Sequence, residues 1–135
     1  MKDDIVGTRR QSNKEWKTNF SQRLLQFGVK IIKLTNKLPK TSAGFAIVNQ
    51  LVKSGTSIGA NFQEAQDASS TPDFIHKLSI SLREAKETLY WLKIIVAAEL
   101  LSTQSVSEEL SECEEIIAVL ISSIKSVKSK IRNEK

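Results

Sequence analysis

The chain has 135 residues, 40% of them hydrophobic and 26% charged, so it is long enough for one domain with a hydrophobic core and too short for two ordinary domains. Five Gly and two Pro argue against an all-β fold with many tight turns, and a single Cys and a single His exclude a disulfide framework and most metal-binding or acid–base sites. The net charge of +5 at pH 7 is moderate, but it is unevenly distributed along the chain.

The first 19 residues carry basic side chains without an apolar periodicity. Arg9, Arg10, Lys14 and Lys17 lie here, and no apolar segment accompanies them, so this region does not resemble a secretory signal. No apolar stretch elsewhere approaches the about 18 residues that a membrane span requires. We therefore expect residues 1–19 to form a flexible basic arm on a soluble, cytoplasmic protein without a targeting segment.

The first predicted helix covers residues 20–38. Its apolar residues recur at alternating spacings of four and three, which is the period of a helix that packs along one face. The residues of this seam are Phe20, Leu24, Phe27, Ile31, Leu34 and Leu38. Pro39 follows the seam and cannot continue a helix.

The second predicted helix, at about residues 43–68, has helical spacing but contains poor helix formers. Its seam consists of Val48, Leu51, Gly55, Ile58, Phe62 and Ala65. Each glycine in a helix interior costs about 1 kcal/mol relative to alanine. We expect Gly55 and Gly59, which lie one turn apart, to offset this cost by letting a neighbouring backbone approach closely.

Two further helices are predicted, at about residues 72–101 and 105–131. Thr71, Pro72 and Asp73 form a consistent start signal for the third helix, with Thr71 as the N-cap. Ser105 and Glu108 form a candidate capping box for the fourth. The third seam is Phe74, Leu78, Ser81, Ala85, Leu89, Leu92 and Val96, and the fourth is Val106, Leu110, Cys113, Ile117, Leu120, Ile124, Val127 and Ile131.

The predicted links between the helices are short, at about residues 40–42, 69–71 and 102–105. Short links make consecutive helices antiparallel neighbours. The sequence therefore predicts an all-α fold, an antiparallel up-down-up-down four-helix bundle over residues 20–132, with residues 1–19 outside it.

Two segments resemble a known family. They are VKSGTSIGANFQEA at residues 52–65 and DFIHKLSISLREA at residues 73–85, and they are similar to signature blocks of the bacterial 23S rRNA intervening-sequence proteins, which are S23 ribosomal protein-like. The resemblance implies a four-helix bundle that assembles into a ring, typically a homopentamer. The accessory variability determinant of diversity-generating retroelements belongs to the same fold group, so the resemblance also implies a reverse transcriptase or nucleic acid as partner.

Cations gather in the two terminal regions. The net charge is +7 over residues 1–40 and +4 over residues 116–135, with −1 over residues 41–104 and −5 over residues 105–115. In the predicted topology the fourth helix ends beside the start of the first, so their cations would form one surface that attracts phosphate without reading sequence. The candidate nucleic-acid-binding residues are Arg9, Arg10, Lys14, Lys17, Arg23, Lys30, Lys33, Lys37, Lys40, Lys125, Lys128 and Arg132.

A solvated face that only keeps the protein soluble is the alternative interpretation of these cations. A ring favours the binding interpretation, because it repeats the same surface in every subunit and turns a modest charge per chain into a continuous positive rim.

An acidic block opens the fourth predicted helix. It consists of Glu108, Glu109, Glu112, Glu114 and Glu115. We expect it to pair with basic residues of the first helix, within the chain or between subunits. Metal binding is the weaker alternative, because carboxylate-bridged metal sites in bundles use Glu-x-x-His motifs and the chain has none. We therefore expect no metal and no cofactor.

A polar cluster is expected where the second and third helices face one another. Counting from the turn at residues 69–71 places Glu64 near His76 and Asn61 near Ser79. We expect these groups to satisfy one another and to set the register of the two helices. A catalytic Glu64–His76 pair is the alternative, and it lacks an obvious nucleophile.

The remaining residues of interest are aromatic or apolar. Trp16 lies on the predicted arm and is the better candidate for contact with a partner. Tyr90 and Trp91 point to different faces of a helix, so at least one of them belongs to the core or to a subunit interface rather than to a base-stacking surface. Cys113 occupies a seam position and is interpreted as a small apolar filler.

Catalysis is not expected. Bundle ribonucleases use an Arg followed four to six residues later by a His, but residues 70–72, which precede the single His76 at that spacing, are S, T and P. The chain has no phosphate-binding loop and no dinucleotide fingerprint. We therefore expect a non-enzymatic, homo-oligomeric binding or scaffold module that engages nucleic acid or a nucleoprotein such as a reverse transcriptase–RNA complex. A protein–protein assembly factor without a nucleic-acid role is the alternative.

Overall fold

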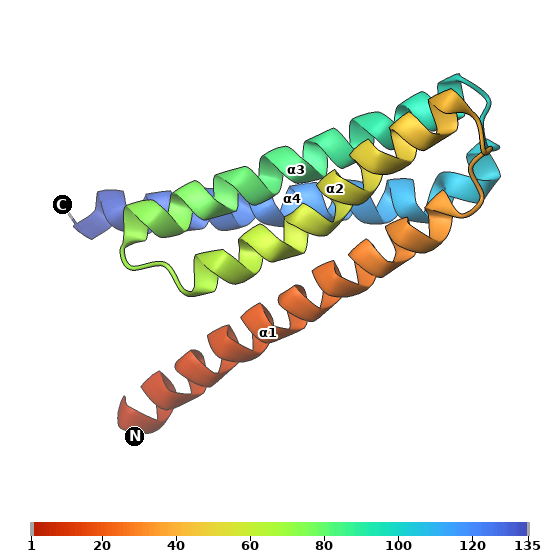
Figure 1. The fold of residues 1–135 in the computed structure, drawn as a ribbon. Coiled ribbons are helices and arrows are strands. Elements are labelled where there is room, and N and C mark those ends of the chain that lie inside the picture. The colour runs from red at the N-terminus through yellow and green to blue at the C-terminus, as the bar shows by residue number, and fades with distance from the viewer. Residues whose placement is uncertain (1, 135) are drawn as a thin grey trace.

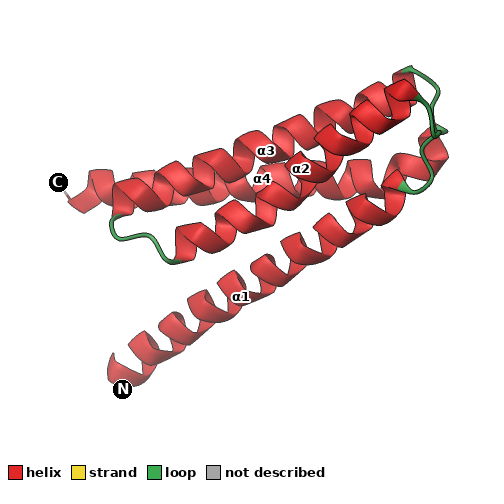
Figure 2. Ribbon diagram, in the orientation of Figure 1, coloured by secondary structure: helices red, strands yellow, loops and turns green. Residues whose placement is uncertain are grey.

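The computed structural model describes the backbone of residues 2–134 and the side chains of residues 12–133. Within residues 2–134 it contains four α-helices and no strand: α1 (Lys2–Thr35), α2 (Ser42–Gln66), α3 (Thr71–Ala97) and α4 (Thr103–Glu134). Consecutive helices run antiparallel, and short loops join them (Figure 1, Figure 2). The predicted all-α arrangement of four helices is therefore confirmed.

The first helix begins earlier than the sequence predicts. α1 starts at Lys2, so the segment expected to be a flexible arm continues the helix. Once a helix is nucleated each added residue gains a hydrogen bond, and this segment contains five Lys and Arg residues, which are good helix formers, and no Pro. Figure 1 shows that these amino-terminal turns extend away from the other three helices. The turns before Phe20 separate from the bundle because the buried apolar seam of α1 begins only at Phe20.

The hydrophobic core follows the predicted seams with changes on α3 and α4. All six seam residues of the first predicted helix are buried, but α1 ends at Thr35 rather than at residue 38, so Leu38 lies in the turn that follows the helix.

On α3 the buried line passes through Thr88 and Ile95, whereas the predicted seam residues Leu89 and Val96 are only half-buried. On α4 the buried line passes through Ile116, and Ile117 is only half-buried, so the assignment of Ile117 to the seam is corrected. A straight α-helix has 3.6 residues per turn and drifts relative to a seven-residue repeat, which moves the core-facing position back by one residue.

Two helix starts lie slightly before their predicted positions. The N-cap of α3 is Ser70 rather than Thr71, and its hydroxyl accepts from the Asp73 backbone N–H at 3.2 Å. At the start of α4, the Ser102 hydroxyl accepts from the backbone N–H of Ser105 at 3.2 Å, so Ser102 replaces Ser105 as the capping residue. In both cases an earlier serine satisfies the free backbone donors of the first turn and the helix gains length.

Glycines bring α1 and α2 into close contact, as the sequence predicts. A Cβ added at Gly55 would lie 2.9 Å from Cγ2 of Ile31, and one added at Gly59 would lie 3.3 Å from Cβ of Leu24. On the other side of the contact, a Cβ at Gly28 would meet nothing closer than 3.7 Å. Gly55 is therefore required by the space available and Gly59 leaves little room for a larger residue, whereas Gly28 has room for a Cβ.

Buried hydroxyl groups join α2 to α3 in the interior. The Thr88 hydroxyl donates to Ser54 Oγ at 2.9 Å, and the Ser81 hydroxyl donates to the Ile58 carbonyl oxygen at 2.8 Å. Ser54, Ser81 and Thr88 are buried almost completely. Because a buried polar group without a partner is costly, these hydrogen bonds favour one register of the two helices.

The predicted Asn61–Ser79 contact is not the one these residues make. The Asn61 side chain donates to the Ser57 carbonyl oxygen at 2.8 Å, and the Ser79 hydroxyl donates to the Ile75 carbonyl oxygen at 2.9 Å. Each side chain thus bonds the preceding turn of its own helix, as short polar side chains in helices often do.

We predict that Gly55→Ala lowers the free energy of unfolding relative to Gly28→Ala by about 1–3 kcal/mol. Both substitutions gain the same helix propensity, so the difference isolates the overlap with Ile31. Denaturant unfolding of the two variants measures it. Equal stabilities would show that α1 and α2 are not held as closely as described.

Candidate nucleic-acid interface

Two of the candidate cations on α1 form ion pairs with the acidic block on α4. Arg23 Nε lies 2.7 Å from Glu112 Oε1, and Arg23 Nη2 lies 3.2 Å from Glu115 Oε2. Lys30 Nζ lies 2.8 Å from Glu108 Oε1. The expected pairing of the acidic block is confirmed within one chain. Arg23 and Lys30 therefore present less net charge to a polyanion than the sequence alone suggests.

The Arg23–Glu112 pair shifts the pKa of both partners. The hydrogen bond from Arg23 lowers the pKa of Glu112, although burial of the carboxylate acts in the opposite direction. The same bond raises the pKa of Arg23. Both side chains keep some exposure to solvent, 35% for Arg23 and 21% for Glu112, so screening limits the strength of the pair.

Three further candidate cations lie at the opposite end of α1 from Lys14 and Lys17. Lys33 is in the last turn of α1, and Lys37 and Lys40 are in the segment between α1 and α2. All three are exposed, and none forms an ion pair with a carboxylate among residues 12–133. Sixteen residues of helix separate Lys17 from Lys33, which is roughly 24 Å at 1.5 Å per residue.

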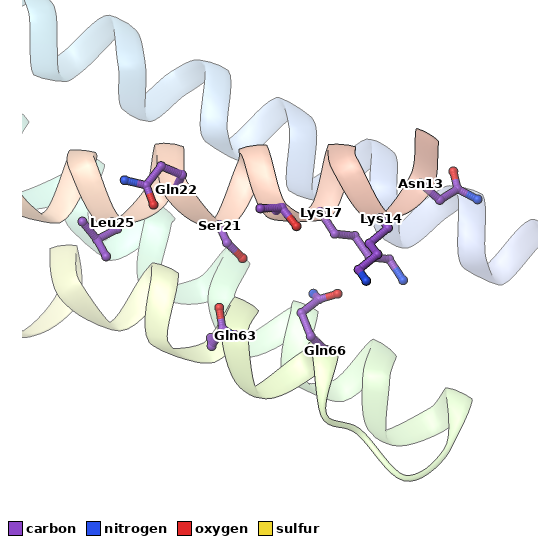
Figure 3. Close-up of a pocket in the computed structure, with 9 residues that line it drawn as sticks. Asn13, Lys14, Lys17, Ser21, Gln22, Leu25, Gln63 and Gln66 are labelled. Atoms are coloured by element: carbon purple, nitrogen blue, oxygen red, sulfur yellow. The ribbon is translucent and has the colours of Figure 1, made fainter. Parts of the chain in front are cut away.

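A cavity of about 650 Å³ lies between the amino-terminal half of α1 and the carboxyl-terminal half of α2. Lys14 and Lys17 line it from α1, and Gln63 and Gln66 line it from α2. Figure 3 shows the two lysine side chains extending from α1 toward Gln66. No carboxylate lines this cavity in the described part of the chain, and neither lysine forms an ion pair there.

The other polar groups of the cavity are neutral. Asn13 and Gln22 on α1 add their amides to those of Gln63 and Gln66, and hydroxyls of α1 complete the wall. An amide both donates and accepts hydrogen bonds, whereas a lysine ammonium only donates. The cavity can therefore bind a phosphate through its lysines and a base or sugar through its amides, without neutralising its own positive charge.

The candidate cations at the end of α4 face elsewhere. A second cavity lies on the other side of Lys17, and the α4 side chains that line it include Ser126 and Lys130. A helix turns by about 100° per residue, so Lys128 lies about 200° around the axis from Lys130, and Lys125 and Arg132 share the side of Lys128. Lys125, Lys128 and Arg132 therefore do not line the cavity beside Lys17, and their part in nucleic-acid binding stays a prediction. The side chains of Arg9 and Arg10 lie outside the described residues.

Glu64 pairs with Lys77 rather than with His76. Lys77 Nζ lies 3.0 Å from Glu64 Oε2, and His76 is exposed. Lys77 follows His76 directly, so its side chain takes the place that counting residues from the turn assigns to histidine. The alternative of a catalytic Glu64–His76 pair gains no support from this arrangement.

Cys113 lies in the core, as predicted. Its thiol donates to the Ala85 carbonyl oxygen at 3.3 Å, and burial raises the pKa of the thiol to about 12. Among the described residues no group of three or more His, Cys, Asp and Glu side chains could hold a metal ion. In the same range no helix has the length and apolar character needed to cross a membrane.

Comparison with known proteins identifies the family. The family model described as 23S rRNA-intervening sequence protein matches residues 7–122. The chain belongs to this family. The match spans α2 and α3 completely, together with the lysines of the α1–α2 cavity, and it confirms the resemblance of residues 52–65 and 73–85.

One solved structure supports the same conclusion for the fold. It is a crystal structure of a Bacteroides thetaiotaomicron protein of unknown function from the S23 ribosomal protein family. The two chains are 40% identical with a TM-score of 0.73, and the similarity covers 78% of this chain and 97% of the other. No curated protein matches the chain. This family member therefore shares its fold with a relative whose own function is unknown.

Sequence reasoning missed Lys130 and the α2 amides. Lys130 belongs to the side of α4 that faces α1, which carries Glu112 near its start and Ser126 near its end. Ser126 and Lys130 follow Glu112 at whole helical turns and so lie on the same side of α4. Pairing of Glu112 with α1 therefore indicates that Lys130 also faces α1. Gln63 lies in the block at residues 52–65, but neither Gln63 nor Gln66 is charged, and only the packing of α2 on α1 shows that they line a cavity.

We predict that Glu112→Gln lowers the free energy of unfolding by about 1 kcal/mol at neutral pH. A carboxylate whose pKa is lowered by folding stabilises the protein above its unfolded pKa, near 4.5, and this contribution is lost as the pH falls through the lower folded value. The variant and the unaltered protein should therefore converge in stability once the pH has fallen below the folded pKa of Glu112. Chemical denaturation across this range measures the difference. Glu114→Gln, at an exposed site, is the control, and an equal pH-dependent loss there would contradict the assignment.

Proposed function

We propose that this member of the family is a non-enzymatic, homo-oligomeric module that binds nucleic acid through the lysine- and amide-lined cavity between α1 and α2. The observation that carries the proposal is the composition of that cavity, in which Lys14 and Lys17 stand among four amides with no carboxylate in the wall. Lysine–phosphate contacts of this kind attract any polynucleotide and supply affinity without sequence preference.

The distribution of charge along α1 also supports this location. The glutamates of α4 pair with Arg23 and Lys30 in the carboxyl-terminal half of α1 and leave Lys14 and Lys17 without a carboxylate partner among the described residues. Repulsion from the acidic block is weakest where α1 extends away from the bundle (Figure 1). A polyanion would therefore contact the amino-terminal half of α1 in preference to the part that carries these pairs.

Self-association is part of the proposal, and an apolar groove supports it. The groove has a volume of about 330 Å³ and lies between α1 and α2 beside the lysine cavity. Leu25 and Ile32 line it and are 55% and 45% exposed. Exposed apolar side chains gathered in one groove are typical of a contact with another protein surface. A second copy bound here would place the lysine cavities of two subunits close together, because both hollows share Leu25 and Gln63.

RNA is the first ligand class to test, because the family takes its name from an intervening sequence of 23S rRNA. We propose a cytoplasmic protein whose partner is RNA or a complex that contains it, such as a reverse transcriptase with its template. A ring of five subunits would repeat the lysine cavity five times, and would convert two lysines per chain into an extended positive surface.

We predict that the double variant Lys14→Gln and Lys17→Gln weakens RNA binding and reduces the slope of log K against log salt by about 1.5 per chain. Each lost lysine–phosphate contact removes roughly 0.7–0.9 from that slope. Fluorescence anisotropy with labelled RNA over a range of salt concentrations measures the effect.

The matched control is Lys33→Gln with Lys37→Gln, which removes the same charge from the far end of α1. It should leave most of the slope intact. An equal loss in the control would move the interface away from the cavity. Failure of the unaltered protein to bind RNA or DNA at about 50 mM salt would overturn the nucleic-acid role and favour a protein–protein assembly factor.

We predict that Leu25→Glu with Ile32→Glu dissociates the oligomer, because two carboxylates would be buried in an apolar contact. Sedimentation should give a mass several times 15.1 kDa for the unaltered protein and about 15.1 kDa for the variant. Phe45→Glu, at an exposed site outside the groove, is the control and should stay assembled. A monomeric unaltered protein at micromolar concentration would contradict self-association.

A further inference from the structure

A second cavity lies on the other side of Lys17, at the end of the bundle where α1 separates from α4. It has a volume of about 320 Å³, and all four helices line it. Phe62 and Leu78, which are almost fully buried, belong to the core beneath it, and Trp16 and Phe74 line it nearer the surface. The volume falls at the lower end of the range of about 300–1,000 Å³ that is typical of sites for small ligands.

Trp16 is the unusual residue of this cavity. It precedes the buried Phe20 by one helical turn and stacks on it, with ring centroids 5.5 Å apart and planes inclined by 13°. Its edge packs against Phe62 at 6.3 Å. The indole nevertheless remains 44% exposed, because α4 presents the small side chains of Ser122 and Ser126 to this layer of the bundle.

The charges around the cavity are all positive. Lys17 and Lys130 line it, and no carboxylate does so among the described residues. Lys17 Nζ lies 5.5 Å above the centre of the Phe74 ring, a cation–π contact that holds the ammonium at the rim. Lys17 also lines the lysine- and amide-lined cavity, together with Asn13 and Gln66, so the two hollows adjoin at this residue.

We propose that this aromatic cavity accepts an unpaired nucleobase, which stacks on Trp16 while the adjoining phosphate lies against Lys17. The inference rests on the proposed nucleic-acid function and deepens it, because it assigns the ligand to single-stranded or unpaired polynucleotide. Stacking on an exposed aromatic ring is tolerant of base identity, which agrees with a surface that reads phosphate rather than sequence. A base in a duplex is already stacked and paired on both sides and does not enter such a cavity.

The test compares a single strand with a duplex on the full-length protein. The probes are labelled oligothymidylate of about 12 nucleotides and a blunt duplex of the same length. Trp16→Leu keeps an apolar contact with Phe20 but removes the stacking surface, and Trp16→Phe retains a smaller ring. Trp91→Phe, on α3, is the control. Fluorescence anisotropy gives the affinities, and indole quenching in the Trp91→Phe background reports contact with Trp16 directly.

A second pair of variants tests the cavity without altering Trp16. Ser126→Phe fills it from the α4 wall, whereas Ser129→Phe adds the same ring at an exposed position that does not line it. Circular dichroism establishes that each variant folds. This pair keeps the proposal testable if Trp16→Leu perturbs the end of the bundle.

The proposal expects the single strand to bind more tightly than the duplex and to quench Trp16. Trp16→Leu and Ser126→Phe should each lower single-strand affinity about tenfold and leave duplex affinity unchanged, and Trp16→Phe and Ser129→Phe should retain most of it. The proposal would be overturned if single-strand and duplex affinities fell equally, or if neither fell. It would also be overturned if Trp16→Leu changed the sedimentation mass, because the cavity would then be filled by a second copy of the chain. Absence of binding to every probe would instead overturn the nucleic-acid function itself.

Discussion

The close contact between α1 and α2 determines how the surface of this protein is arranged. Gly55 and Gly59 leave room for Ile31 and Leu24, so the two helices meet closely along the carboxyl-terminal half of α1. Toward the amino terminus the buried seam ends at Phe20, and α1 extends away from the bundle (Figure 1). The apolar groove lies on the outer side of the tight contact, and the two lysine-containing cavities lie beyond it. The positions of the groove and the two cavities therefore depend on where α1 packs against α2 and where it separates from the bundle.

The positive charge of α1 also differs between the part that packs on the bundle and the part that extends from it. The carboxylates of α4 pair with Arg23 and Lys30, where the two helices are within reach of one another. These pairs are partly exposed, so they contribute modestly to stability, but they remove positive charge from that part of the helix. Positive charge remains at both ends of α1, and in the amino-terminal half the lysines line a cavity whose other polar groups are amides and hydroxyls. A protein with a moderate net charge can in this way present a locally positive surface to a polyanion.

The proposed roles use adjoining parts of one helix pair. Self-association would use the apolar groove around Leu25, phosphate binding would use the lysine cavity next to it, and base stacking would use the aromatic cavity on the far side of Lys17. This arrangement explains how a bundle with no metal cluster among its described residues, and with its cysteine buried as a core filler, can still have a specific function. Binding alone would suffice for it, provided that several copies act together.

Periodicity and composition alone determined the helices, their antiparallel order and nearly the whole core of this protein, because burial of an apolar face depends on spacing that is written into the chain. They also indicated the close approach at Gly55 and Gly59 and the pairing of the acidic block. Only the tertiary structure decided which cations share a surface. It paired Arg23 with Glu112, turned Lys128 away from Lys17, and brought Lys130 and the neutral Gln66 beside it. The physical reason is that each residue turns a helix by about 100°, and helices of different length and tilt accumulate this rotation differently. Which side chains meet depends on the total rotation, and a local sequence pattern does not give it.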